Sequence, residues 1–343
     1  MSRVSPTSRS WRTSPYLFAA VVAVAIGLTI VGIEMSRRLG AGQNPPANPS
    51  VRVESSADTL GAAYPRELRD GSGATLKIMA RPQRIVSQTL GTDEILLAIC
   101  SPDRIVGLSV FSRDPQYSCV VKQASAMSAQ SVRGPEEILR LNPDLIFVAG
   151  YSRAETVELL RAAGAPVFRV TSFDHIEDIK TNIRTIGYAT GDDERAEALV
   201  AQMEREINAI RARLPEGSER PRVMSYSAGF TAGANTLFDD LVRTVGAVNV
   251  SAEQGLKGFP KISAEQVAAW DPDFLVTGAG ARKFDEVRRL LLSDPAIASS
   301  RAGRTGKIIV IDDCHYLAVS QYVVGAIEGL ADGLYSNTPE GAK

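Results

Sequence analysis

A dense group of chemically capable side chains occupies residues 312–316, with the sequence DDCHY. His and Tyr are residue types that ligate haem iron, and His315 or Cys314 could bind a transition metal. Two observations weigh against a resident metal ion. Neighbouring residues of a strand point to opposite faces, and the only other histidine of the chain is His175. We therefore predict that His315 and Tyr316 contact a ligand, and that no zinc site built from several histidines exists.

Aromatic and basic side chains recur in the segments that follow the predicted strands. Aromatic rings can stack on a flat macrocycle or an aromatic chelator, and guanidinium groups can pair with acidic groups of such a ligand. Each residue taken singly could instead have a structural role, but together they predict a site for a large ligand that is both polar and aromatic. The predicted contacts are Phe111, Arg113, Arg133, Tyr151, Tyr226, Phe230, Phe259, Arg282, His315 and Tyr316.

The chain has three cysteines. Cys100 and Cys119 are close enough in sequence to form a disulfide around the second predicted strand, and an exported location would permit it. Cys314 would then remain unpaired. Three buried or free thiols are the alternative, because an odd number of cysteines defines no framework.

Several function classes find no support. The net charge is −1 and basic residues alternate with acids, so no basic patch for nucleic acid is present. The chain has no phosphate-binding loop, no nucleophile elbow and no helix with paired metal-binding histidines. Ser225 and Ser227 lie in the segment SYSAG without an assignable histidine base. We predict a binding protein without intrinsic cofactor, not an enzyme.

The elements that position these side chains read as two similar halves. The phrase of a Glu, an apolar helix, Asn/Asp-Pro-Asp, an apolar strand and Gly occurs at 136–150 and again at 265–278. Short β-branched runs bounded by Gly and Pro are typical of buried parallel strands. We predict an α/β fold with two Rossmann-like lobes, each with a mainly parallel central sheet, at 64–172 and 216–338. Ligands of such sheets bind at the loops after the carboxyl ends of the strands.

Two helical patterns connect the lobes at 173–215. Apolar residues recur at helical spacing from Ala196 to Leu214, which predicts a long interlobe helix. Bending such a helix would break backbone hydrogen bonds, so we expect limited closure of the lobes. In the first lobe a helix is predicted to start at Thr92 as its N-cap. Asp93 and Glu94 are then expected to interact with the positive helix end rather than to do chemistry.

The N-terminal region predicts a membrane attachment. Residues 16–33 are uncharged and long enough to cross a bilayer core of about 30 Å as a helix. Arg3, Arg9 and Arg12 precede this stretch, which favours a cytoplasmic N-terminus at 1–15 and export of the remainder. We predict an uncleaved transmembrane anchor at 16–35 and a flexible tether at 36–63. A cleaved signal segment is the alternative. The soluble part would lie in the periplasm or otherwise outside the cytoplasm, attached to the inner membrane.

Several segments of the chain, taken together, resemble a known family. The segments RIVSQTLGTDEILLAI, PEEILRLNPDLIFVAG, LLRAAGAPVFRV and KISAEQVAAWDPDFLVTG, in this order, are similar to the helical-backbone (class III) substrate-binding proteins of ABC importers. The resemblance covers roughly 84–335. It implies a monomer with two lobes joined by a rigid helix and an interlobe cleft for a metal chelate, either a ferric siderophore, cobalamin or haem. It also implies docking onto a membrane permease and its ATPase.

Family members commonly dock through one acidic residue on each lobe. The matching positions here are Asp114 in the first lobe and Asp239, Asp240 or Glu253 in the second, although a clear Glu in each lobe is missing. Solvated or helix-capping carboxylates would explain these residues equally well. The alternative function is a membrane-tethered sensor or accessory protein that keeps the clamp fold and has no transport role.

Overall fold

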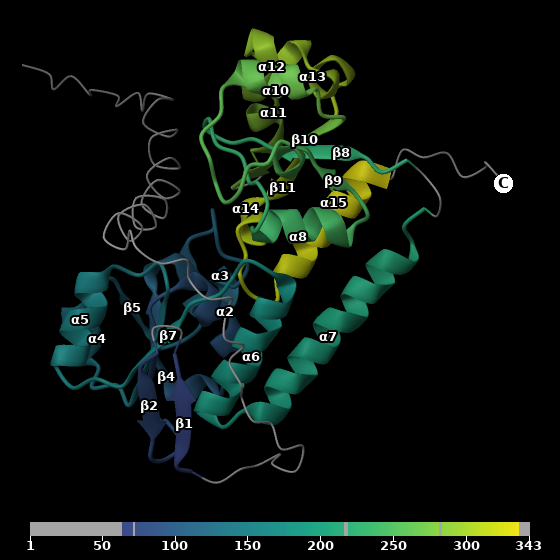
Figure 1. Ribbon diagram of the computed structural model, residues 1–343. Helices are drawn as coiled ribbons and strands as arrows, with labels where there is room; N and C mark the ends of the chain where they lie inside the picture. The colour runs from purple at the N-terminus through teal and green to yellow at the C-terminus, as the bar shows by residue number, and fades with distance from the viewer. Residues whose placement is uncertain (1–63, 71–72, 216–218, 281–282, 336–343) are drawn as a thin grey trace, which may run out of the picture. The chain divides into compact units, whose positions relative to one another are not determined.

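The computed structural model describes residues 64–70, 73–215, 219–280 and 283–335 (Figure 1). All of them belong to one compact unit of the chain, residues 45–343. The predicted anchor at 16–35 and tether at 36–63 lie outside the described residues. Within the described ranges, no helix has both the length and the apolar character needed to cross a membrane.

The first lobe contains a five-stranded parallel sheet with the order β5-β4-β3-β6-β7. All residues of β3 and β6 are buried, as expected for a parallel sheet that is covered on both faces. The five strands are β3 (Ile85–Ser87), β4 (Ile105–Ser109), β5 (Gln130–Val132), β6 (Leu145–Ala149) and β7 (Val167–Val170).

Helices cover both faces of this sheet. One apolar cluster joins Val86 and Ile146 to Ile138 and Leu160, which lie on α4 (Pro135–Arg140) and α5 (Ala154–Ala162). The opposite face packs against α2 (Leu90–Ile99) and the interlobe helices. Short elements complete the lobe: η1 (Pro102–Arg104), η2 (Val110–Arg113) and α3 (Val121–Ser125). Ahead of the parallel sheet, β1 (Arg66–Arg69) and β2 (Thr75–Ile78) form a separate two-stranded antiparallel sheet.

The second lobe repeats the architecture with a four-stranded parallel sheet of order β11-β10-β8-β9. Its strands are β8 (Arg222–Ser225), β9 (Val248–Asn249), β10 (Phe274–Ala279) and β11 (Ile308–Asp312). Its helices are α8 (Leu237–Thr244), α9 (Val250–Glu253), α10 (Ala264–Trp270), α11 (Phe284–Leu292), α12 (Pro295–Ser299), α13 (Arg301–Thr305), α14 (Asp313–Tyr316) and α15 (Val323–Tyr335). The predicted α/β class with mainly parallel sheets is confirmed.

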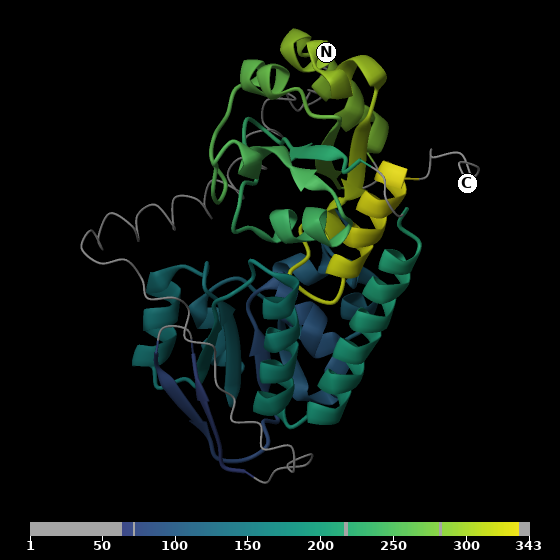
Figure 2. The same cartoon turned by 45° about the vertical axis from the view of Figure 1, so that its right-hand side comes forward.

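Two helices connect the lobes, α6 (Ile176–Thr190) and α7 (Asp193–Ala212). Gly191 separates them in the left-handed conformation, with φ 71°, which glycine adopts without steric penalty. The helices approach closely at Gly187, because a Cβ there would lie 2.4 Å from the Cβ of Ala196. Helix α7 contacts α2 of the first lobe and α15 of the second, and Figure 2 shows it running beside both.

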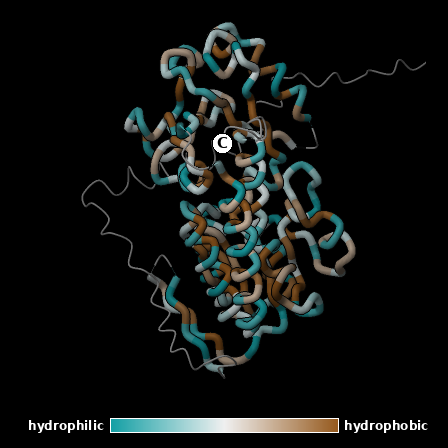
Figure 3. Tube along the Cα trace, turned by 90° about the vertical axis from the view of Figure 1, so that its right-hand side faces the viewer, coloured by the Kyte–Doolittle hydropathy of each residue, from teal (hydrophilic) through white to brown (hydrophobic). Residues whose placement is uncertain are grey.

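The hydrophobic core is continuous through these helices. One cluster of buried side chains includes Ile85 and Phe147 of the first sheet, Met203 of α7, and Val276 of the second sheet. In the hydropathy view of Figure 3 the apolar residues of the first lobe gather in its interior. Separating the lobes fully would therefore expose apolar surface, at roughly 25 cal/mol for each Å².

Candidate functional site

The lobes meet where several parallel strands reach their carboxyl ends. Gly280 follows β10, and a Cβ at this position would lie 2.3 Å from Cγ of Gln116, in the loop that follows β4 and η2. Gly91, at the start of the helix after β3, also lies close to the second lobe, because a Cβ there would lie 2.6 Å from Cγ2 of Val319. Both glycines are needed for the close approach. This junction is the place where open parallel sheets bind ligands.

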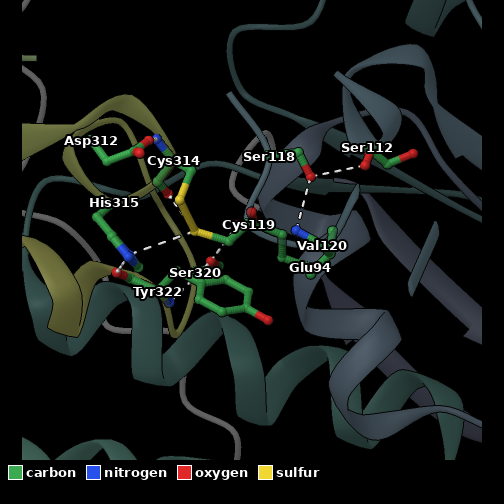
Figure 4. Close-up of a disulfide and its surroundings, with 10 residues drawn as sticks. All are labelled: Glu94, Ser112, Ser118, Cys119, Val120, Asp312, Cys314, His315, Ser320 and Tyr322. Atoms are coloured by element: carbon green, nitrogen blue, oxygen red, sulfur yellow. Dashed lines mark hydrogen bonds between the residues drawn. A yellow bond between two sulfur atoms is a disulfide. The ribbon is translucent and has the colours of Figure 1, made fainter. Parts of the chain in front are cut away.

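A disulfide links the lobes at the junction. Cys119 of the first lobe is bonded to Cys314 of α14, and their Cα atoms lie 5.1 Å apart (Figure 4). The predicted pairing of Cys100 with Cys119 is therefore wrong. Cys100 is a buried free thiol whose sulfur lies 3.2 Å from a carboxylate oxygen of Asp192. Sequence proximity favoured the wrong pair because the bonded cysteines are 195 residues apart.

A second interlobe contact centres on Glu94. Ser320 Oγ donates a hydrogen bond to Glu94 Oε2 at 2.5 Å, and Gln321 Nε2 donates to the Glu94 carbonyl oxygen at 2.9 Å. The other carboxyl oxygen, Oε1, is buried without a hydrogen-bond partner. Burial raises the pKa of Glu94 to about 7, although the bond from Ser320 opposes this rise. We name this contact, Glu94 with residues 319–322, the interlobe clasp.

Asp93 lies beside the clasp but points into the first lobe. Its carboxylate accepts hydrogen bonds from the backbone N–H of Ser109 at 3.1 Å and from Ser109 Oγ at 2.5 Å. Complete burial raises its pKa to about 7, against the lowering effect of these bonds. The bonds tie the end of β4 to α2, so Asp93 fixes the loop that continues into η2.

The expected N-cap, Thr92, is wrong, and although Asp93 does lie in the first turn, the carboxylates of Asp93 and Glu94 bind Ser109 and Ser320. The helix begins one turn earlier, at Leu90 with Thr89 as N-cap, so both acids point inward. The sequence did contain a signal that this helix is buried. The two carboxylates interrupt a segment, LGTDEILLAI, that is otherwise apolar or small all round, and a helix of that composition is buried on every side.

The exposed aromatic rings of the described residues lie at the predicted ligand loops. Phe111 is 50% exposed, Tyr151 49% and Phe259 45%. Phe111 packs edge-to-face with Tyr117, and Tyr151 packs at a tilt on Phe173. Single exposed apolar residues are ordinary on a folded surface, whereas a contiguous exposed patch marks a binding surface. Their contact with a ligand remains a prediction.

The other predicted contacts in the second lobe are more enclosed. Tyr226 follows β8 and packs against the apolar cluster around Met224. Phe230 forms a backbone bridge with Lys261, which holds the loop after β8 against the loop that carries Phe259. The two loops thus form one surface beyond the sheet.

The basic residues that were predicted to contact the ligand differ in how far their side chains are already bound within the protein. Arg113 donates to Ser131 Oγ at 2.8 Å and to the carbonyl oxygen of Ala129 at 2.7 Å, so it braces the end of β5. Arg133 is exposed beyond β5, and its contact with a ligand stays a prediction. Arg282 lies outside the described residues.

His315 and Tyr316 are held by the protein. His315 Nδ1 lies 3.1 Å from the carbonyl oxygen of Tyr322, and a Cβ on Gly325 of α15 would come within 2.4 Å of the same nitrogen. Tyr316 packs edge-to-face on the core residue Phe238, and burial raises its pKa. Nδ1 of His315 is thus engaged and the Tyr316 ring is packed against the core, and contact of either residue with a ligand stays a prediction.

The metal-ligand atoms of Cys119, Cys314 and His315 all lie within 4.8 Å of one another. Thiolate is the form of cysteine that binds metal. The two sulfurs are bonded to each other here, so this trio does not fit a metal ion in its oxidised state.

The acids predicted to dock a transporter have different surroundings. Asp239 is buried and accepts from Asn249 Nδ2 at 3.1 Å. Asp240 accepts from the backbone N–H of Ile176 at 2.9 Å and borders a pocket of about 380 Å³ between α6, α7 and α8. Asp114 accepts from the Gln116 backbone. Glu253 is exposed and pairs with Arg222 at 3.4 Å. Glu253 and Asp114 remain the better placed candidates.

Comparison with known proteins adds three findings. The family model described as periplasmic binding protein matches residues 85–314. A cobalamin-binding protein of Halobacterium salinarum is 27% identical over 327 residues, covering 94% of this chain and 85% of the relative. An uncharacterized ABC transporter substrate-binding lipoprotein of Bacillus subtilis, YvrC, is 22% identical and covers 85% of this chain and 92% of its own.

Solved structures share the fold. The apo form of the periplasmic heme-binding protein RhuT from Roseiflexus sp. RS-1 is 29% identical, with a TM-score of 0.64, covering 74% of this chain and 98% of that one. The molybdate-bound protein MolA from Haemophilus influenzae is 18% identical with a TM-score of 0.65, covering 79% and 91% respectively. The similarity to MolA supports the fold alone.

Proposed function

Because the chain belongs to the periplasmic binding protein family, in its class III form, we propose that it is the substrate-binding protein of an ABC importer. It captures a metal chelate at the junction of the lobes and delivers it to a membrane permease. The observation that carries the proposal is the set of exposed rings, Phe111, Tyr151 and Phe259, on loops beyond the parallel sheets. Such rings can stack on a flat conjugated ligand.

Among metal chelates we favour a corrinoid of the cobalamin type. The relative that covers nearly the whole chain is named as a cobalamin-binding protein. Haem needs an axial ligand from its protein in most haem sites, whereas cobalamin carries its own nucleotide base. Here Tyr316 packs on Phe238 and His315 holds its Nδ1 at the carbonyl oxygen of Tyr322, so an axial ligand from this pair would have to be Nε2 of His315 or the Tyr316 hydroxyl. The ring stacking requires no axial ligand, and exposed Arg133 would offer a donor for the phosphate of the nucleotide loop.

The proposed role in import also sets the cellular location of the protein. The protein is exported and attached by its segment at 16–35, with the binding unit outside the cytoplasm beside its permease. Asp114 and Glu253, one on each lobe, would meet basic residues of the permease.

Thermal unfolding of the full-length chain in detergent tests the ligand class. The panel is cyanocobalamin, dicyanocobinamide, haemin and ferrichrome. A ligand that binds only the native state at 100 times its Kd stabilises it by about 2.7 kcal/mol, which for a chain of this size raises Tm by about 5 °C. We expect this rise with the two corrinoids. A rise in Tm with haemin or ferrichrome alone would reject a corrinoid as the ligand but keep the class of metal chelates. No rise in Tm with any of the four ligands would reject the whole class of metal chelates.

Delivery is tested separately from binding. The liganded protein should stimulate the ATPase activity of its permease complex in vesicles, and Asp114→Lys or Glu253→Lys should abolish the stimulation without changing ligand affinity. Binding without stimulation would favour the tethered sensor instead.

A further inference from the structure

The disulfide at the junction is a covalent tie between lobes that are otherwise held there by hydrogen bonds and packing. Cys119 belongs to the loop between η2 and α3, and Cys314 to α14. Both are partly exposed, so a small reductant can reach the bond. The tie lies beside the interlobe clasp, because Cys119 and residues 319–322 approach the same helix, α2, as Figure 4 shows for Glu94 and Ser320.

The sulfur of Cys119 has a hydrogen-bond donor beside it. His315 Nδ1 lies 3.1 Å from the carbonyl oxygen of Tyr322 and 3.6 Å from Cys119 Sγ (Figure 4). A carbonyl oxygen can only accept, so Nδ1 carries the hydrogen. In the disulfide form this hydrogen is directed to the carbonyl oxygen of Tyr322. Sharing it with Cys119 Sγ when the S–S bond breaks would stabilise the Cys119 thiolate and make this sulfur the better leaving group in thiol–disulfide exchange.

Few hydrogen bonds join residues 319–322 to α2. Glu94 is buried with one carboxyl oxygen unpartnered, and the salt bridges among the described residues do not include it. Two hydrogen bonds, from Ser320 and Gln321, hold the segment to α2. Without the disulfide, these bonds and the contact of Val319 with Gly91 would remain.

We propose that Cys119–Cys314 is a redox latch, a site of thiol–disulfide exchange that controls separation of residues 313–322 from α2. A dithiol reductant supplies the two electrons. Its thiolate attacks Cys314 Sγ, the S–S bond breaks, and the electron pair leaves on Cys119 Sγ beside His315. The second thiol of the reductant then displaces Cys314 as a thiolate. The reductant becomes a cyclic disulfide, and its two protons end on the two protein thiols. The latch goes beyond the proposed function and its test needs no ligand.

Hydrogen exchange of the full-length chain in detergent, with and without dithiothreitol, tests the latch. We expect amides in 90–94 and 313–322 to exchange about tenfold faster after reduction, while those of β6 and β10 are unchanged, because local opening need not involve the core. Cys119→Ser should show the fast exchange without reductant. Cys100→Ala, the control, should keep the response. Equal exchange with and without reductant would overturn the proposal, as would alkylation of both Cys119 and Cys314 in unreduced protein.

The leaving-group role of His315 has its own readout. His315→Leu replaces the imidazole with an apolar side chain of similar size that has no N–H donor. Without the hydrogen bond to the charged sulfur, the rate of reduction by dithiothreitol, measured by thiol alkylation, should fall about tenfold. A merely structural role would leave that rate unchanged or raise it by loosening the junction, and either result would remove His315 from the exchange step.

Discussion

At the residue scale, Glu94 makes the clasp sensitive to pH. Its carboxyl is buried in the junction, and burial raises its pKa to about 7. In the unfolded chain the same group titrates near 4.3. Between these values the folded protein holds a proton that the unfolded chain has released, so stability falls as the pH rises through this window. Asp93, also with its pKa raised to about 7 by burial, adds to the same trend.

Glu94→Gln should therefore stabilise the protein at high pH only. The glutamine amide has nearly the shape of the protonated carboxyl group, and its oxygen can accept the hydrogen bond from Ser320 Oγ. Each pKa unit corresponds to 1.36 kcal/mol, so the gain in unfolding free energy above pH 7 is at most about 3.7 kcal/mol. Urea titrations at pH 4.5 and pH 8 measure it. Glu158→Gln, on the exposed face of α5, is the control. A gain of equal size at both pH values would refute the assignment.

The exposed rings make a second residue-scale prediction. Phe111→Ala should change Tm little, because half of its side chain is exposed. Tyr151→Ala should lower Tm somewhat, because its ring packs on Phe173 and burial of its hydroxyl raises its pKa to about 12. Each should weaken binding of cyanocobalamin by about 1 kcal/mol, roughly fivefold, through lost stacking. Titration calorimetry measures the affinity, and Leu159→Ala, an exposed apolar residue on α5, is the matched control. Unchanged affinity in both ring variants would move the ligand elsewhere.

At the scale of elements, the junction depends on how tightly α6 and α7 are packed, since α7 contacts both lobes. Gly187→Ala would place a Cβ 2.4 Å from that of Ala196. Overpacking of this kind reduces stability by about 1–3 kcal/mol, measured by urea unfolding. The same change at Gly134, where a Cβ would meet nothing within 4 Å, should have a much smaller effect.

A double variant gives the decisive control for that contact. Ala196→Gly added to Gly187→Ala should recover part of the lost stability, because it removes the opposing methyl group. Additive losses in the two single variants would show that the helices do not meet there.

The regular elements were predictable from the sequence, and the junction was not. Strands such as LIFVA carry their own signal in a continuous apolar run, and the interlobe helices carry theirs in helical spacing. The pairing of Cys119 with Cys314 and the bond from Ser320 to Glu94 join residues that are 195 and 226 positions apart. Such contacts depend on the relative placement of two lobes, which local pattern does not encode.

At the scale of the whole molecule, the two sheets share a continuous core through α7, and a disulfide and a clasp hold the junction. This arrangement predicts small changes on binding rather than wide closure, as expected where the bridge between lobes is helical. The ligand loops are then largely preformed, so binding loses little free energy in ordering them.

The most direct test of the account is calorimetric titration of the full-length protein in detergent with cyanocobalamin. Haemin is titrated in parallel, and the double variant Phe111→Ala/Tyr151→Ala is titrated alongside the native chain. The account predicts saturable binding of cyanocobalamin by the native chain, at least tenfold weaker binding by the double variant, and no saturable binding of haemin. Binding of haemin in preference to cyanocobalamin, or affinity for cyanocobalamin that is independent of the two rings, would contradict it.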